Sequence, residues 1–149
     1  MDAMCIAKAG LMAGVAMGVV AMALNMLKIT SLDITKYMGC MLTGQSSGTT
    51  SMVAGLVAHL AASVVFAFVY VWVARYIHMA LTVTNGAIFG LAHAVIGGLM
   101  LPMIDSMNHC VSQGKVKAMQ MFAQGHGTMG MASYFAAHVV FGVALAMFL

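Results

Sequence analysis

Residues 52–74 read MVAGLVAHLAASVVFAFVYVWVA, an apolar stretch that contains no charged residue and ends just before Arg75. A helix needs about 20 apolar residues to cross the hydrocarbon core of a bilayer, and this stretch supplies them. Lipid offers no hydrogen-bond partner to an unpaired backbone, and the hydropathy does not alternate here as it does in barrel strands. The stretch therefore predicts a transmembrane helix.

Three further stretches have the same character, and they lie at Cys5–Leu27, Val83–Met103 and Met131–Leu149. Together they predict an all-α fold: a four-transmembrane-helix bundle that forms a single integral membrane domain over residues 1–149. The connection between the second and third spans, Arg75–Thr82, is short. Those two helices are therefore expected to be antiparallel neighbours.

The composition excludes several classes of protein. The chain has 149 residues, of which 63% are hydrophobic and 6% are charged, whereas a soluble domain carries about 25% charged residues. The net charge of +3 includes no basic stripe, which argues against a nucleic-acid partner. The sequence contains no HExxH motif, glycine-rich phosphate loop or paired carboxylates, so we do not expect an enzyme.

The two longer connections carry apolar residues at helical spacing. Asp33–Leu42 and Lys115–Ala123 each place three apolar side chains on one face. This pattern predicts two short interfacial amphipathic helices, one after the first span and one after the third.

Basic residues suggest an orientation in the membrane. Four of them lie in the two long connections, against two on the opposite side (Lys28, Lys36, Lys115 and Lys117, against Lys8 and Arg75). The positive-inside rule then places the long connections in the cytoplasm. Cys40 and Cys110 lie on this same side. They are expected to stay reduced if the side is cytoplasmic, and they can pair if it faces an oxidising compartment.

The chain resembles two copies of one helical hairpin, with halves at about 1–78 and 79–149. An offset of 76 aligns two glycines of the first span with two of the third, and an offset of 79 aligns Ala-His in the second span with Ala-His in the fourth (Gly10 with Gly86, Gly14 with Gly90, His59 with His138). Both halves then enter the membrane from the same side. This predicts a pseudo-two-fold axis along the membrane normal.

Three histidines fall inside predicted spans. His59, His93 and His138 each follow an alanine and precede a small residue by four positions. A rise of about 1.5 Å per residue places all three, together with Met17 of the first span, at a similar depth. Side chains from four helices at one level can meet on the bundle axis.

Two functions compete for these side chains. Ionisable residues inside a membrane are costly and often functional, and three imidazoles with a thioether would suit copper. The leading interpretation is therefore an integral membrane metal-binding protein with His59, His93, His138 and Met17 as ligands. Copper is preferred over haem b, and zinc is a further alternative. Neutral histidines can also simply hydrogen-bond neighbouring helices, or line a proton path.

The alternative is a non-catalytic accessory subunit of a larger membrane complex of the respiratory or oxidase type, in which the histidines are structural. The lack of catalytic motifs and the glycine-rich helix faces favour it.

Several motifs occur together in this chain. They are Gly10-x-x-x-Gly14, the Asp-Ile-x-x-x-Met-Gly-x-Met-Leu segment at Asp33–Leu42, His59 with Tyr70, Gly90-Leu91-Ala92-His93, and Ala137-His138 with Gly142. In these the chain resembles a group of small bacterial four-span membrane proteins of unknown function. The resemblance implies a multi-pass protein of the bacterial inner membrane, and it implies no activity.

Overall fold

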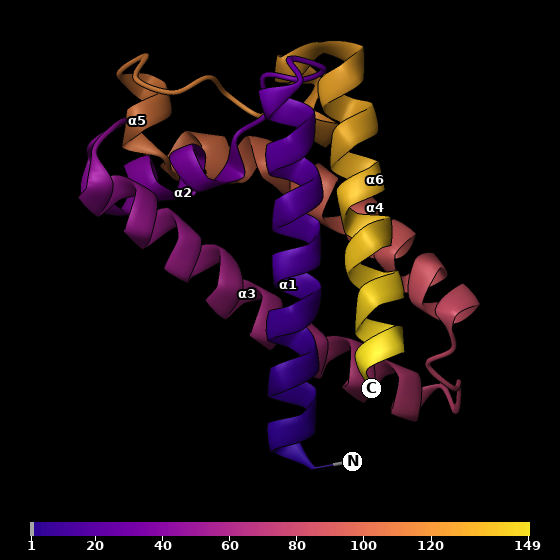
Figure 1. The fold of residues 1–149 in the computed structure, drawn as a ribbon. Coiled ribbons are helices and arrows are strands. Elements are labelled where there is room, and N and C mark those ends of the chain that lie inside the picture. Colours follow the sequence, from indigo (N-terminus) through magenta and orange to yellow (C-terminus); the bar gives the residue numbers. More distant parts are fainter. Residues whose placement is uncertain (1) are drawn as a thin grey trace.

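The computed structural model describes residues 2–149 and contains four long helices (Figure 1). They are α1 (Ala3–Met26), α3 (Thr49–Tyr76), α4 (Val83–Met107) and α6 (Gly127–Phe148). All four are long and apolar enough to cross a membrane. The all-α four-helix bundle expected from the sequence is confirmed, and the protein is of the multi-pass membrane type.

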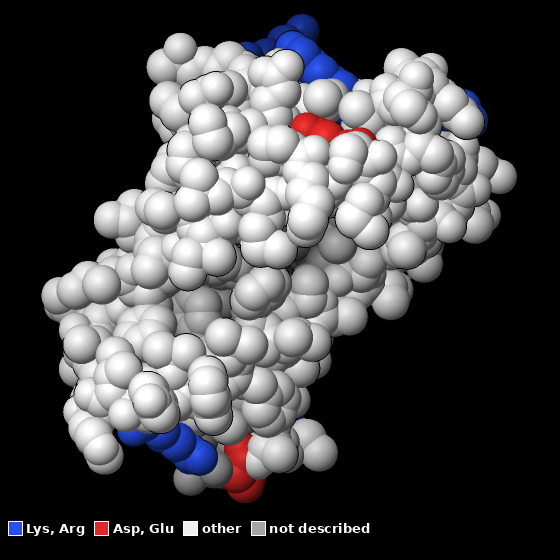
Figure 2. Space-filling model, turned by 180° about the vertical axis from the view of Figure 1, so that it is seen from behind, with Lys and Arg blue, Asp and Glu red and all other residues white. Residues whose placement is uncertain are grey.

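Charged side chains gather at the two ends of the molecule. The face in Figure 2 shows Lys, Arg and Asp at its upper and lower ends, with a broad uncharged band between them. Many exposed side chains of the long helices are large and apolar, such as Val57, Val65, Ile96 and Leu99. Such a band matches the hydrocarbon core of a bilayer in character.

Glycines set which helices pack closely. A Cβ at Gly10 would lie 2.7 Å from Ala67 Cβ, so α1 and α3 touch almost backbone to backbone. In the other half, a Cβ at Gly86 would collide with the carbonyl oxygen of Gly142, where α4 crosses α6. Small residues at such crossings let membrane helices approach closely, and α1 and α6 also pack side by side. These contacts are consistent with the expected repeat, which stays a prediction.

The second and third spans were expected to be antiparallel neighbours, but their backbones make few contacts with each other. The backbone of α3 packs mainly on α1 and on α2 (Ile34–Thr43), and that of α4 packs on α6. α3 and α4 meet through aromatic side chains, with the ring centroids of Phe66 and His93 4.0 Å apart and those of Tyr70 and Phe89 5.4 Å apart.

The first expected surface helix is present as α2. Asp33 caps its beginning, because its carboxylate accepts a hydrogen bond from the backbone N–H of Lys36 at 2.9 Å. Gly44, with φ of +74°, ends it in the left-handed conformation that glycine adopts easily.

The prediction of a second surface helix at Lys115–Ala123 is wrong. A short helix α5 (His109–Ser112) is followed by non-helical residues 113–120 and by the 3-10 helix η1 (Met121–His126). The carboxylate of Asp105 accepts hydrogen bonds from the backbone N–H groups of Met119 and Gln120 at 3.0 and 2.7 Å. These bonds hold the segment in a non-helical conformation, despite the apolar spacing that suggested a helix.

The two connections are tied to each other. Cys40 of α2 and Cys110 of α5 form a disulfide. Nearby, the hydroxyl of Tyr37 donates to the carboxylate of Asp105 at 2.7 Å. Burial and this hydrogen bond raise the pKa of Tyr37 above its ordinary value. The disulfide joins α2 to α5, and the hydrogen bond joins α2 to the last turns of α4.

Candidate functional site

His59 is held against the first helix. Its side chain is 7% exposed, and its Nε2 donates to the carbonyl oxygen of Gly14 at 3.1 Å. Ser63, one turn later, donates back to the carbonyl oxygen of His59 at 2.8 Å. One imidazole nitrogen is therefore already used in joining α1 to α3.

Of the four predicted ligands, His93 and His138 lie side by side. Their ring centroids lie 4.8 Å apart with the rings perpendicular. Nδ1 of His138 donates to the carbonyl oxygen of Tyr134 at 2.8 Å, and Nδ1 of His93 lies 3.2 Å from the hydroxyl of Tyr70. The pair is enclosed by aromatic rings.

The fourth predicted ligand, Met17, is partly buried. It packs against the apolar cluster that contains Ile6 and Phe141. The structure therefore pairs His93 with His138 and hydrogen-bonds His59 to Gly14. Within residues 2–149, no three His, Cys, Asp or Glu side chains form a group able to hold a metal ion.

A groove opens where α1 and α3 separate. The two helices are in contact at Gly10 and Gly14 and diverge toward the end that bears the disulfide (Figure 1). At Gly18 an added Cβ would already lie 3.6 Å from Nε2 of His59, an ordinary contact rather than a clash. Beyond this point lies a groove of about 850 Å³, with His59 among its lining residues.

The groove changes in character along its length. Its walls are apolar. Its polar lining residues gather at the outer end, where the last turn of α1, the α1–α2 connection, the start of α2, the α2–α3 loop and the first turn of α3 meet, together with the apolar Leu32 and Ile34 (walls: Val15, Val19, Met22, Val53, Leu56, Leu60; polar residues of the outer end: Asn25, Asp33, Lys36, Ser46, Ser47, Ser51). A long apolar cleft with a polar mouth is complementary to an amphiphile.

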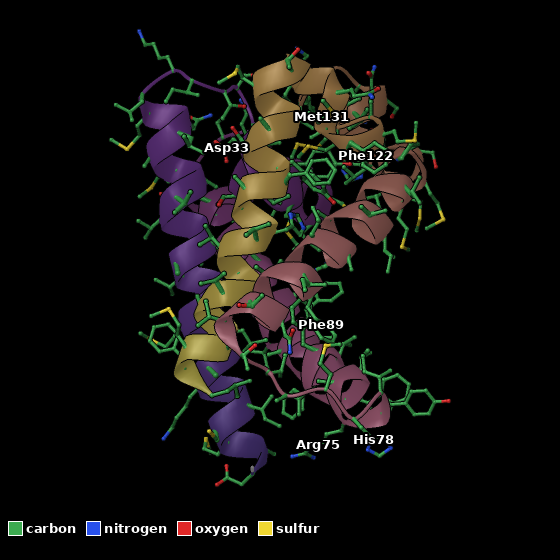
Figure 3. The ribbon with its side chains drawn as sticks, turned by 90° about the vertical axis from the view of Figure 1, so that its right-hand side faces the viewer. Asp33, Arg75, His78, Phe89, Phe122 and Met131 are labelled. Atoms are coloured by element: carbon green, nitrogen blue, oxygen red, sulfur yellow. A yellow bond between two sulfur atoms is a disulfide. The ribbon has the colours of Figure 1, made fainter. Side chains whose placement is uncertain are left out.

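The space between α4 and α6, which the expected repeat would match to this groove, is filled. η1 packs between α4 and α6, and its Phe122 lies directly against Gly98 of α4. The ring of Phe122 is also 5.8 Å from that of Phe135 on α6 (Figure 3). In the first half α2 packs on α3 instead, and the space beside α1 stays open.

The groove was missed from the sequence, although a signal for it exists. Gly10, Gly14 and Gly18 follow one another at intervals of four, which marks one face of a helix. Larger apolar residues and then Asn25 continue toward the polar end. When the glycines on one face of a span are followed by larger residues, the pattern indicates that the neighbouring helix touches the glycines and then moves away.

Comparison with known protein families, with curated proteins and with solved structures found no match to this chain. The resemblance to small bacterial four-span proteins therefore stays a prediction.

Proposed function

We propose that this protein binds a membrane lipid laterally, with an acyl chain of the lipid in the α1–α3 groove. The observation that carries the proposal is the groove itself, about 850 Å³ with apolar walls and a polar outer end. Its volume is within the range of ligand pockets, roughly 300–1,000 Å³. Its polarity runs in the same direction as that of a lipid, from an apolar interior to a polar surface.

Hydrocarbon is the occupant that fits this location. An empty apolar groove would lose dispersion contacts along its whole lining, and water there would find few hydrogen-bond partners. The second half of the fold supports the same reading, because Phe122 supplies apolar bulk at the corresponding place. We infer that a lipid chain supplies that bulk in the first half.

The proposal is tested with Gly18→Leu, which adds a side chain to the groove wall without an initial backbone clash. Ala61→Leu, at an exposed position of α3 that does not line the groove, is the matched control. Lipids that remain bound to the detergent-purified protein are counted by native mass spectrometry. We expect Gly18→Leu to lose the retained lipid and Ala61→Leu to keep it. Equal retention in both variants would overturn the proposal.

A second candidate function, the metal binding expected from the sequence, is favoured by the meeting of His93 and His138. A metal-ligating histidine usually engages its other ring nitrogen in a hydrogen bond, as Nδ1 of both residues does here. Imidazole ligands suit copper, the metal that the sequence analysis preferred, and they also suit zinc. Copper bound per protein, measured by elemental mass spectrometry, should fall in His93→Ala and His138→Ala and stay constant in His78→Asn. No copper in the unmodified protein after loading would remove this candidate.

The disulfide bears on orientation. Structural disulfides persist in oxidising compartments and are rare in the cytosol. We infer that the face bearing Cys40 and Cys110 lies outside the cytoplasm. This reverses the orientation expected from the basic residues, of which this face carries four and the opposite face two. Maleimide labelling of Lys117→Cys in intact cells tests this, in a Cys5→Ser background that removes the free thiol on the opposite side. Labelling by a membrane-impermeant reagent supports it, and labelling only after lysis contradicts it.

The accessory-subunit alternative predicts stable co-purification with a larger membrane complex. A protein that is isolated alone, folded and lipid-loaded would contradict that alternative.

A further inference from the structure

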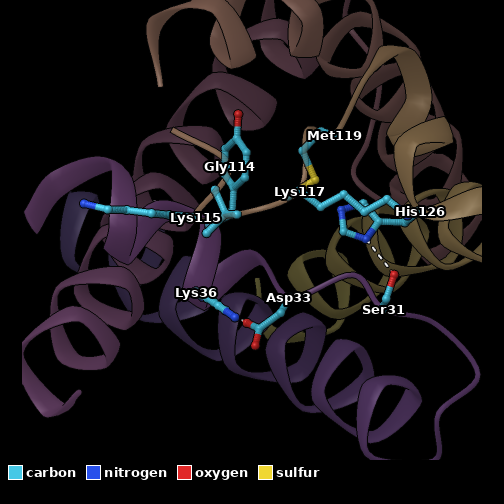
Figure 4. Close-up of a pocket in the computed structure, with 10 residues that line it drawn as sticks. Ser31, Asp33, Lys36, Gly114, Lys115, Lys117, Met119 and His126 are labelled. Atoms are coloured by element: carbon cyan, nitrogen blue, oxygen red, sulfur yellow. Dashed lines mark hydrogen bonds between the residues drawn. The ribbon is translucent and has the colours of Figure 1, made fainter. Parts of the chain in front are cut away.

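A basic pocket adjoins the groove. It has a volume of about 410 Å³, and its lining includes three lysines, Ser31, Asp33 and His126 (Figure 4; the lysines are Lys36, Lys115 and Lys117). The chain has six Lys and Arg residues in total, so half of its basic side chains surround this one pocket. Asp33 is the one carboxylate in the lining, and the local charge therefore favours an anion.

The carboxylate of Asp33 is already engaged. Its oxygen caps the backbone N–H of Lys36 at the beginning of α2. Lys115 reaches across to the end of the same helix, where its Nζ donates to the carbonyl oxygen of Gly44 at 2.9 Å. These contacts fix two walls of the pocket.

The third wall comes from the segment after α4. Asp105 accepts the backbone N–H groups of Met119 and Gln120, and the Cys40–Cys110 disulfide joins this region to α2. The lysines thus project from segments that are tied to each other.

His126 has an unused hydrogen-bonding atom. Its Nδ1 lies 2.9 Å from the hydroxyl of Ser31, a contact drawn in Figure 4. Its Nε2 is buried, and within residues 2–149 it has no hydrogen-bond partner. When Ser31 donates to Nδ1, the neutral ring carries its proton on Nε2 and needs an acceptor. A phosphate oxygen bound in the pocket would supply one once the side chains that cover Nε2 move aside.

The pocket and the groove share two residues. Asp33 and Lys36 line both spaces, so the basic pocket lies beside the polar outer end of the groove. A phosphate next to Lys36 would leave the acyl chain of the same molecule free to enter the groove.

The geometry points to an anionic phospholipid as the ligand, with its headgroup phosphate held by Lys36, Lys117 and His126. This inference rests on the proposed lipid-binding function and names its headgroup class. A zwitterionic lipid offers the same chains and the same phosphate, but it also carries an amine that the lysines repel. The preference for an anionic headgroup is therefore electrostatic.

The test is a native mass spectrometry titration of delipidated, full-length protein with phosphatidylglycerol and with phosphatidylcholine of identical acyl chains. Lys36→Gln and Lys117→Gln are compared with Lys8→Gln, an exposed lysine of α1 that lines neither space. We expect tighter binding of phosphatidylglycerol. Each pocket variant should weaken it about fivefold, as expected for one lysine near a charged headgroup. Lys8→Gln should have no effect.

The outcomes separate the two proposals. Equal binding of both lipids, with Gly18→Leu still abolishing it, would overturn the headgroup assignment and leave the groove intact. Failure to bind either lipid would overturn both proposals. Equal binding of the two lipids together with thermal stabilisation by inorganic phosphate that Lys36→Gln removes would assign the pocket to a free anion and overturn the lipid headgroup.

Discussion

The Nε2 atom of His59 donates a hydrogen bond to the carbonyl oxygen of Gly14 at 3.1 Å, at the level where α1 and α3 stop touching and the groove begins. On one side of this bond the helices are in close contact through Gly10 and Ala67. On the other side lie the apolar walls that we assign to a lipid chain. The bond therefore fixes the inner end of the groove.

Loss of that bond should loosen the α1–α3 pair. We expect His59→Ala to destabilise the folded protein by about 1 kcal/mol, the usual scale for a polar contact between membrane helices. Unfolding in mixed detergent micelles measures this. His78→Asn, at an exposed position, should leave the unfolding midpoint unchanged. Equal stability of His59→Ala and the unmodified protein would show that the bond contributes nothing to the fold.

The glycine crossings should respond very differently to one added methyl group. At Gly86 a Cβ collides with the carbonyl oxygen of Gly142, so Gly86→Ala should cost about 1–3 kcal/mol through forced separation of α4 and α6. At Gly18 the nearest atom lies at 3.6 Å, and Gly18→Ala should be neutral. The same unfolding measurement decides, and equal effects of the two substitutions would argue against the close α4–α6 crossing.

The disulfide should protect its two cysteines from alkylation. Cys40 and Cys110 should resist alkylation until the protein is reduced, whereas Cys5 should react without reduction. Closing a loop between positions 70 residues apart should stabilise the protein by about 4 kcal/mol on the chain-entropy scale. Mass spectrometry after alkylation is the measurement. Full alkylation of all three thiols in unreduced, freshly prepared membranes would contradict both the disulfide and the inferred orientation.

Tyr37 should make stability depend on pH at the alkaline end. Burial and the hydrogen bond to Asp105 raise its pKa, so the folded protein holds this proton more tightly than the unfolded chain does. Stability from this group is fully present below the unfolded pKa of about 10 and is lost as pH rises above it. Tyr37→Phe should therefore show a smaller loss of stability between pH 9 and 11. An identical pH profile for Tyr37→Phe and the unmodified protein would exclude the effect.

The sequence predicted those features that depend on hydropathy and local capping. The four spans follow from apolar length, and α2 follows from Asp33 and the spacing after it. The helical rise predicted a common depth for the histidines, but it did not predict their rotation about each helix. Rotation depends on which faces pack together. The glycine crossing turns His59 toward Gly14, and a different contact brings His93 to His138.

The conformation of the segment after α4 was also not predictable from the sequence. Phe122 and Ala123 have φ angles of +56° and +61°, which a local pattern of apolar residues does not indicate. Long-range contacts hold this conformation, with Asp105 binding the preceding backbone and Phe122 packed on Gly98. The basic pocket needs that same segment, so it was not predictable from local sequence.

The groove is tested most directly by a photoreactive lipid that carries a diazirine in its acyl chain. After irradiation in vesicles, the labelled peptides are mapped by mass spectrometry. We predict labelling concentrated on the groove walls, at residues such as Val19, Met22 and Leu56, and its loss in Gly18→Leu but not in Ala61→Leu. Labelling spread evenly over all lipid-facing helices and unchanged by Gly18→Leu would contradict a lipid site between α1 and α3.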